Sequence, residues 1–179
     1  QLQECRTIPN PIDSNKFYPF DKIRAKRLLG LPIDRKIILF GAQSATTDAR
    51  KGYDLLLRAL SSNLISTANA DLAIFGNPKG EKSPSIPFRT HFLGRTNDDY
   101  KLSLIYSAAD IFLAPSRQEN FPNTVAESGC CGTPVVAFDI GGMPDLIEPW
   151  QNGALARPYD ITDFAAKTSA IMDLNLAPE

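Results

Sequence analysis

The sequence predicts an α/β protein with a parallel sheet covered by helices on both faces. Short apolar runs typical of buried strands alternate along the chain with helix-like segments. This alternation favours parallel strands joined by right-handed helical crossovers. The chemically distinctive segments follow strand-like runs, as expected at the carboxyl edge of a parallel sheet, where ligands bind. With 179 residues, the chain has the length of one domain with a substantial core.

The expected strands are apolar runs bounded by polar or turn-forming residues. In chain order they are residues 5–8, 36–40, 71–75, 89–93, 110–114 and 134–138, with a weaker one at 153–156. Helical patterns fill the intervals at 21–29, 52–62, 98–108 and 123–131, with a short one near 143–147 and a last one at 161–174. Residues 77–87 are rich in Pro, Gly, Ser and Lys and are expected to form an exposed loop.

Composition limits the classes of partner and site. Hydrophobic residues make up 43% of the chain and charged residues 22%, which is typical of a soluble globular protein. The net charge of −1 gives no electrostatic reason to expect nucleic acid. The chain has three cysteines and a single histidine, His91, so no metal-ligand cluster is expected. The cysteines favour a reduced, cytosolic setting.

Glu119 and Glu127 form the most informative pair of residues, seven positions lying between them. They follow the strand-like run 110–114. Pro122 suits the first turn of a helix, where its missing N–H would have no intrahelical partner. Glu119 is therefore expected in a strand-to-helix loop, and Glu127 about a turn and a half inside the helix.

A phosphate site is expected between these two glutamates. The free amides of Asn123 and Thr124 lie there, at the positive end of the helix dipole. A carboxylate on each side of a phosphate is unfavourable unless both carboxylates bind hydroxyl groups. A nucleotide sugar has this layout, with ribose, diphosphate and hexose in sequence.

The block 116–147 continues with glycines and prolines around an apolar run and resembles the signature of family 4 glycosyltransferases. These are retaining enzymes of GT-B architecture. Two acids at this spacing are common by chance, but the ordered set of flanking features is specific. The resemblance covers nearly the whole chain and extends to residues 8–13 with Phe17 and Pro19, to Lys51-Gly52 before an apolar helix, and to residues 92–94.

The resemblance implies a Rossmann-like, nucleotide-sugar donor-binding domain over residues 1–179, the C-terminal half of a GT-B fold. Residues 1–19 would lead in from a preceding domain and contain the first strand, and the N-terminal acceptor domain is expected to be absent from a chain that begins at Gln1. The chain alone should therefore bind donor but transfer little sugar. The expected donor is a nucleotide-diphosphate sugar, and the expected acceptor is a glycan, lipid-linked sugar or polysaccharide precursor. The family needs no metal or other cofactor for transfer.

Matched residue by residue, the family pattern assigns roles in the site. Glu119 and Lys51 are the expected catalytic residues, one beside the donor hexose and one stabilising charge on the departing diphosphate. Glu127 matches the glutamate bonded to the ribose hydroxyls. The other expected donor-binding residues are Asn120, Phe121, Asn123, Thr124, Arg50, Gly41 and Arg95.

The chain departs from the family pattern at one position. An arginine usually follows the glycine at the end of the first long strand, but here Gly41 is followed by Ala42. Arg50, next to Lys51, is the candidate for the second cation, although neighbouring residues at a helix start point in different directions. Arg95 is expected to stack on the donor base.

Two other functions stay open. A nucleotide-sugar epimerase of the same fold would share the diphosphate site and need further acid and base residues outside this chain. A non-catalytic module that binds nucleotide sugar or protein would keep the fold, and Ala42 favours it. His91 lies inside an expected strand and is interpreted as structural.

Localisation follows from what the chain contains. It shows no apolar run of membrane-spanning length and no signal-peptide pattern, so the sequence predicts a cytoplasmic protein. The basic segment 22–36 contains acidic neighbours and is interpreted as a solvated helix face. Attraction of this segment to an anionic membrane surface is the second interpretation, which leaves peripheral membrane association open.

Overall fold

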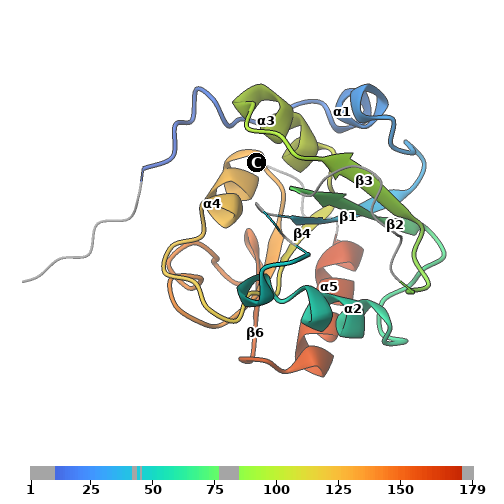
Figure 1. Ribbon diagram of the computed structural model, residues 1–179, viewed down its shortest axis with the longest axis vertical. Helices are drawn as coiled ribbons and strands as arrows, with labels where there is room; N and C mark the ends of the chain where they lie inside the picture. Colours follow the sequence, from blue (N-terminus) through green and yellow to red (C-terminus); the bar gives the residue numbers. More distant parts are fainter. Residues whose placement is uncertain (1–10, 42–43, 45, 77–84, 175–179) are drawn as a thin grey trace, which may run out of the picture.

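The computed structural model describes residues 11–41, 44, 46–76 and 85–174. Within these residues one sheet has the strand order β3-β2-β1-β4-β5-β6, and all neighbouring strands are parallel (Figure 1). The strands are β1 (Lys36–Gly41), β2 (Ala70–Phe75), β3 (Thr90–Gly94), β4 (Ile111–Ala114), β5 (Val135–Phe138) and β6 (Gly153–Ala156). The helices are α1 (Lys22–Leu29), a 3₁₀ turn η1 (Ala49–Lys51), α2 (Tyr53–Leu60), α3 (Asp99–Ser107), α4 (Asn123–Cys130) and α5 (Ile161–Leu174).

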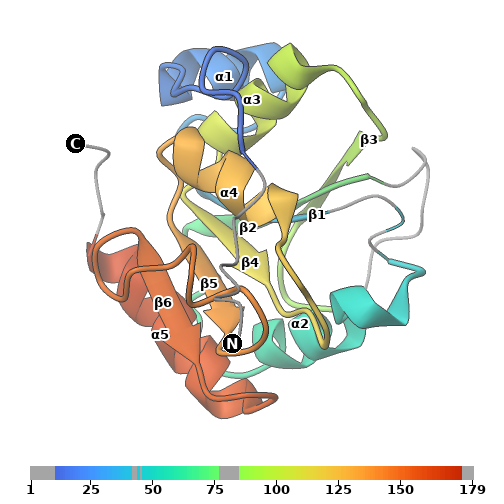
Figure 2. The same ribbon diagram turned by 90° about the vertical axis from the view of Figure 1, so that its left-hand side faces the viewer.

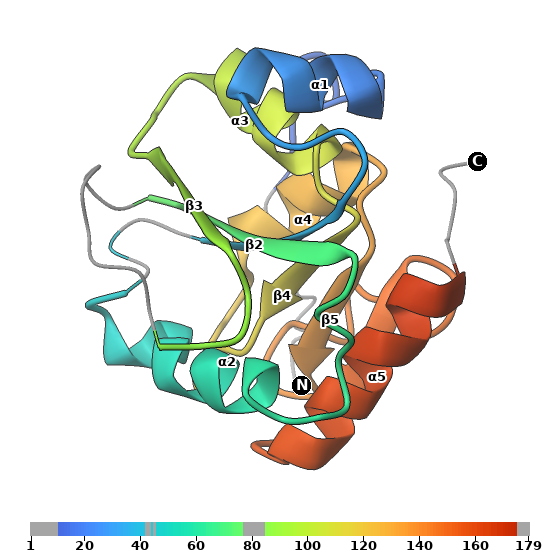
Figure 3. The ribbon, with the colours of Figure 1, turned by 90° about the vertical axis from the view of Figure 1, so that its right-hand side faces the viewer.

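Helices cover both faces of the sheet. Figures 2 and 3 show α1, α3 and α4 on one side of the strands and α2 and α5 on the other. The hydrophobic core is divided accordingly into two clusters. Along β1, Ile38 and Phe40 face the cluster of α2 and α5, whereas Ile37 and Leu39 face that of α1, α3 and α4. Because both faces are buried, the inner strands are continuous apolar runs rather than alternating ones.

The predicted fold class, a Rossmann-like α/β sheet with helices on both faces, is confirmed. Most predicted elements occur within a residue or two of their expected bounds. The helix expected at 52–62 is preceded by η1, which the sequence pattern did not indicate. The strand expected at residues 5–8 lies outside the described residues.

The short helix expected near 143–147 was wrong. This segment consists of turns, although Ile147 N donates one helical bond to the Met143 carbonyl at 3.0 Å. Met143, Leu146 and Ile147 have helical spacing and are all at least partly buried. Their apolar side chains are accommodated by one turn of chain, and Pro149 disfavours a helical backbone at the residue before it, Glu148.

The sheet has a switch point between β1 and β4. From there the chain progresses to β2 and β3 on one side and to β5 and β6 on the other. In open α/β sheets, ligands bind in the crevice outside the carboxyl ends of the strands at such a point. Gly52, just before α2, and Pro115, just after β4, contact each other here.

At the opposite edge of the sheet, Asp110 holds α1 against the strands. Its carboxylate accepts hydrogen bonds from Lys22 Nζ at 2.8 Å, Lys26 Nζ at 3.1 Å and the Ile37 amide at 2.7 Å. The Lys26 side chain is only 5% exposed. Burial alone would raise the pKa of Asp110, but Lys22, the Ile37 amide and Lys26 together hold it below its ordinary value.

We expect Asp110 to make folding stability depend on pH in the acid range. A carboxyl whose folded pKa is depressed contributes stability above its unfolded pKa, about 3.9, and loses it as the pH falls through the folded pKa. Asp110→Asn should therefore lower the free energy of unfolding at pH 7 by about 3 kcal/mol, because the ammonium of Lys26 is left buried without a counter-charge. It should also flatten the decline in stability below about pH 4.

Urea unfolding between pH 2.5 and pH 7 measures both effects. Asp34→Asn is the matched control, since Asp34 is an exposed carboxylate on the turn before β1. An equally steep acid decline in Asp110→Asn and wild type would contradict the assignment.

Candidate functional site

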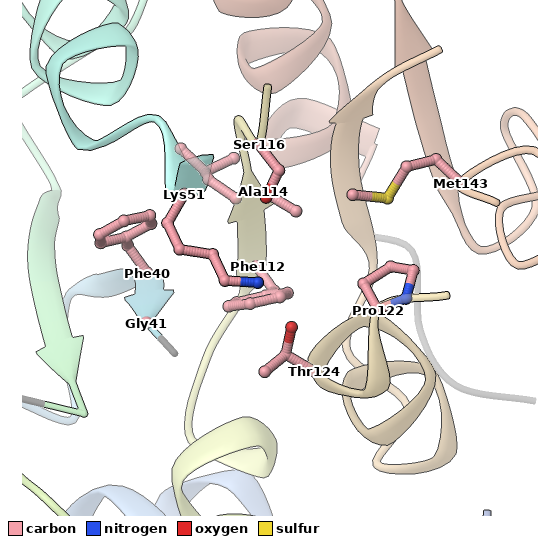
Figure 4. A pocket seen from close by; sticks show the side chains of 10 residues that line it. Phe40, Gly41, Lys51, Phe112, Ala114, Ser116, Pro122, Thr124 and Met143 are labelled. Carbon is pink, nitrogen blue, oxygen red and sulfur yellow. The ribbon is translucent and has the colours of Figure 1, made fainter. Parts of the chain in front are cut away.

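An open cleft of about 490 Å³ lies at the switch point, at the carboxyl ends of β1 and β4. Its lining comes from the segment before α2 and from the loop and helix start after β4. The lining residues are Ser44, Asp48, Arg50, Lys51, Glu119, Phe121, Pro122, Asn123 and Thr124. A smaller hollow shares Lys51, Pro122 and Thr124 with the cleft, and Figure 4 shows Lys51 reaching across the strand ends toward Thr124.

An ion pair joins the two sides of the cleft. Lys51 Nζ lies 2.5 Å from Glu119 Oε1, although the residues are 68 positions apart. The same oxygen accepts a bond from Ser116 Oγ at 3.1 Å. The two side chains are 25% and 13% exposed, so solvent screens this pair less than a surface pair. Glu119 Oε2 receives no hydrogen bond from the described residues and can accept one.

The N-terminus of α4 forms one wall of the cleft. Pro122 is its N-cap, one residue before the position we expected, and no side chain caps this end. The amides of Asn123 and Thr124 therefore lack intrahelical partners, and they carry the positive end of the helix dipole. Such an end binds anionic oxygens. The wall therefore has the properties of a phosphate site, with Lys51 opposite.

Glu127 lies one helical turn beyond the cleft lining, on the same face of α4 as Asn123. Its Oε2 accepts a hydrogen bond from the Tyr106 hydroxyl of α3 at 2.7 Å. Burial raises the pKa of Glu127 above its ordinary value, and the bond from Tyr106 acts in the opposite direction. Tyr106 is a fully buried partner that the sequence analysis missed.

Glycines allow three backbone segments to touch at the cleft. Gly52, with a φ of 69°, lies so close to the Pro115 carbonyl that a Cβ would be 1.9 Å from its oxygen. Gly141 and Gly142 pack on the backbone that carries Glu119, where added Cβ atoms would lie 1.8 Å and 2.0 Å from the carbonyl oxygens of Glu119 and Asn120. The backbone of the glycine pair therefore packs directly on the backbone of the loop that carries Glu119.

Arg117 ties the two sides of the cleft together, and the sequence analysis did not single it out. Its guanidinium binds both carboxylate oxygens of Asp54 at 2.7 Å and 2.6 Å and also donates to the Ala49 carbonyl. Its amide donates to the Arg50 carbonyl at 2.7 Å. The segment that carries Lys51 is thereby bound to the loop that carries Glu119.

The other expected site residues differ in position. Phe121 lines the cleft, whereas Asn120 is exposed and meets Gly142 through its backbone. Gly41 lines the smaller hollow, and its missing Cβ leaves room for Phe75. Arg95 is exposed after β3 and does not line the cleft.

Arg50 lines the cleft, but Asp48 holds its guanidinium through two hydrogen bonds of 3.0 Å and 2.7 Å. The Arg50 side chain is 70% exposed. The hydrogen bonds from the Arg50 side chain and amide lower the pKa of Asp48 to about 2. Position 42, where the family arginine is missing, lies outside the described residues.

Comparisons with known proteins agree with this arrangement. The sequence profile of the family Glycosyl transferases group 1 matches residues 35–173. A D-inositol 3-phosphate glycosyltransferase from Acidothermus cellulolyticus is 30% identical over 190 residues, which cover 97% of this chain and 42% of that protein. Sucrose-phosphate synthase from Thermosynechococcus elongatus has a TM-score of 0.78 at 27% identity, covering 95% of this chain and 44% of that one. HepE from Anabaena, in complex with UDP-glucose, has a TM-score of 0.65 at 21% identity, covering 94% and 52%.

The chain belongs to the group 1 glycosyltransferases. The predicted resemblance to glycosyltransferases is therefore confirmed. The solved structures that are similar to this chain have GT-B architecture. At 21% identity, the HepE structure supports the fold alone. The chain spans 42% of the length of the Acidothermus protein.

Two further findings apply to the described residues. None of their helices is both long and apolar enough to cross a lipid bilayer. Within the same residues, no group of three or more His, Cys, Asp or Glu side chains is arranged to hold a metal ion.

We predict that Gly52→Ala destabilises the chain more than Gly30→Ala. Both glycines end a helical segment with a φ of 69°, but Gly30 has open space where a Cβ would lie. Gly30→Ala should cost about 1–2 kcal/mol of unfolding free energy through the left-handed backbone alone. Gly52→Ala should cost about 1–3 kcal/mol more, because the Cβ would overlap the Pro115 carbonyl.

Urea unfolding of the two variants at equal pH measures the difference. Equal losses would mean that the contact between Gly52 and Pro115 does not constrain the loop.

Proposed function

We propose that this chain is the donor-binding, C-terminal domain of a retaining, metal-independent glycosyltransferase of family 4. The proposed reaction transfers a hexose from a nucleotide-diphosphate sugar. The observation that carries the proposal is the pair of Lys51 and Glu119 beside the uncapped N-terminus of α4. This arrangement places a cation, a carboxylate and free amides around one cleft.

Each end of the cleft suits a different part of such a donor. The diphosphate would lie between Lys51 and the amides of Asn123 and Thr124, where positive charge is concentrated. Glu127, one turn along α4, would accept hydrogen bonds from the ribose hydroxyls. Glu119, at the other end, would accept from hydroxyls of the hexose.

Lys51 would act mainly in the transition state. Breaking the bond between sugar and phosphate leaves additional negative charge on the departing nucleoside diphosphate. A fixed cation stabilises this charge strongly when part of the site is shielded from water. Before the donor binds, Glu119 holds the Lys51 ammonium at the cleft.

The HepE structure, which shares this fold, contains UDP-glucose, and we propose a donor of the same class for this chain. For the acceptor we propose a glycan, lipid-linked sugar or polysaccharide precursor, bound largely by a preceding domain, since these residues span 42% of the length of the Acidothermus relative. A cytoplasmic location with peripheral membrane contact is part of the proposal. On α1, Arg24 and Arg27 are exposed beside the exposed apolar side chains of Ile23 and Leu28, a combination that suits an anionic membrane surface.

A screen of UDP, GDP, ADP and their hexose derivatives by thermal shift and calorimetry tests the proposal. At least one nucleoside diphosphate should bind and raise the melting temperature of the 179-residue chain, without metal. Sugar transfer to an acceptor should require a longer protein that also contains the proposed acceptor-binding domain. No binding of any of these ligands would contradict the proposal, and conversion of the donor without acceptor would identify an epimerase instead.

We predict that Glu119 and Glu127 distinguish the two ends of the donor. Glu127→Gln should weaken binding of the nucleoside diphosphate with or without its hexose by about tenfold, because a charge-assisted hydrogen bond is weakened. Glu119→Ala should weaken binding of the nucleotide sugar while leaving free nucleotide almost unaffected. Calorimetry with both ligands measures the pattern, and equal losses for both ligands in Glu119→Ala would contradict it.

We predict that Lys51→Ala lowers turnover of the longer enzyme by about a hundredfold, which is typical for loss of one such electrostatic donor. Arg50→Ala should have a smaller effect of the same kind, and the double variant should be non-additive if both cations serve one phosphate. Steady-state kinetics of the three variants provide the test. Full activity after Lys51→Ala would favour a non-catalytic binding module or a donor site placed elsewhere.

A further inference from the structure

We propose that Tyr106 is a positioning residue for the ribose-binding carboxylate, fixing its direction. This inference rests on the proposed function, in which Glu127 binds the ribose. Tyr106 OH donates to Glu127 Oε2 at 2.7 Å from α3, the helix packed beside α4. No other hydrogen bond from the described residues reaches this carboxylate.

Tyr106 is fixed on every side. Its ring meets Phe75 and Phe112 edge to face, with centroid distances of 5.6 Å and 5.8 Å. Its backbone carbonyl accepts a bond from Thr133 Oγ1 at 2.7 Å, and its side chain is fully buried. A hydroxyl held in this way has one direction in which to donate, and Glu127 lies there.

The contact occupies one oxygen of the carboxylate and leaves the other for a ligand. An ionised carboxylate has about four lone-pair sites, so Oε1 and the remaining lone pair of Oε2 can accept from two vicinal hydroxyls. The direction of the carboxylate is therefore set before the nucleotide arrives. Pre-organisation of this kind lowers the entropic cost of binding.

Tyr106 also counters the effect of burial on Glu127. Burial raises the pKa of Glu127, Asp99 at the start of α3 raises it further, and the hydroxyl of Tyr106 lowers it. Two thiols near the end of α4 also adjoin this region, and burial raises the pKa of Cys131 to about 11 and that of Cys130 in the same direction, so both are neutral. Burial and the charge of Glu127 raise the pKa of Tyr106 well above its ordinary value, so its hydroxyl remains a donor throughout the neutral range.

Removal of the Tyr106 hydroxyl should therefore weaken nucleotide binding to an extent that depends on pH. In Tyr106→Phe the pKa of Glu127 should rise, and a protonated carboxyl is a poorer acceptor. The nucleotide dissociation constant, measured by calorimetry with the best ligand from the screen, should rise a few-fold at pH 8. Relative to wild type, the dissociation constant should rise about tenfold at pH 5.5. At this pH more of the Glu127 carboxyl is protonated in the variant, and its charge-assisted hydrogen bonds to the ribose hydroxyls are lost.

Comparison with wild type at each pH removes the contribution of the nucleotide's own phosphate titration. Ser107→Ala is the matched control, because it removes the next buried hydroxyl of α3, which accepts from the Phe20 amide and does not bond Glu127. It should reproduce any general loosening of α3 without the acid-dependent loss of affinity. In a Glu127→Gln background, Tyr106→Phe should add no pH dependence.

A second measurement covers the case in which Tyr106→Phe does not fold. In wild type, NMR should show a slowly exchanging hydroxyl proton of Tyr106 that persists when nucleotide binds and shifts as Glu127 titrates. The inference would be overturned if wild type binds nucleotide but the ratio of the dissociation constants of Tyr106→Phe and wild type does not change with pH. Loss of the Tyr106 hydroxyl proton signal on nucleotide binding would also overturn it. Failure of wild type to bind any nucleotide would instead overturn the proposed function.

Discussion

The site depends on the close approach of three backbone segments at the carboxyl edge of the sheet. Gly52 lies against the Pro115 carbonyl, and Gly141 and Gly142 lie against the carbonyls of Glu119 and Asn120. A side chain at any of these positions would separate the segments, since close-packed interiors do not absorb an added methyl group without movement. Lys51 and Glu119 belong to different segments. The distance between them is therefore set by glycines, which have no functional side chain of their own.

This packing also places a cation next to the carboxylate of Glu119. A carboxylate near a phosphate site would oppose an anionic ligand, but Glu119 already shares its charge with Lys51. Removing two partly buried charges from water is costly unless they satisfy each other. The pair is therefore a stable resting arrangement, and Ser116 adds a second donor to the same oxygen. A phosphate that attracts Lys51 would free Glu119 to accept from sugar hydroxyls.

The sequence predicted the features that depend on local pattern. Buried strands on both faces appear as continuous apolar runs, and the spacing of Glu119 and Glu127 around Pro122 placed one glutamate in a loop and the other on a helix. The spacing of Met143, Leu146 and Ile147 was deceptive, because apolar residues three and four apart also fit one buried turn. Arg117 and Tyr106 could not be found in this way. Their partners Asp54 and Glu127 are 63 and 21 residues away, and only the folded chain brings the loop after β4 to α2 and packs α3 beside α4.

The two glutamates of the site differ in the partner that each has. Glu119 faces a cation, whereas Glu127 faces the neutral hydroxyl of Tyr106 and keeps its full negative charge when ionised. A phosphate is therefore repelled from the Glu127 end and attracted to Lys51 and the start of α4. Hydroxyl groups are accepted at both ends. Under the proposed function, this asymmetry selects one direction for the donor, with its ribose along α4 and its hexose toward Glu119, because the reverse register would bring a phosphate to the unneutralised carboxylate.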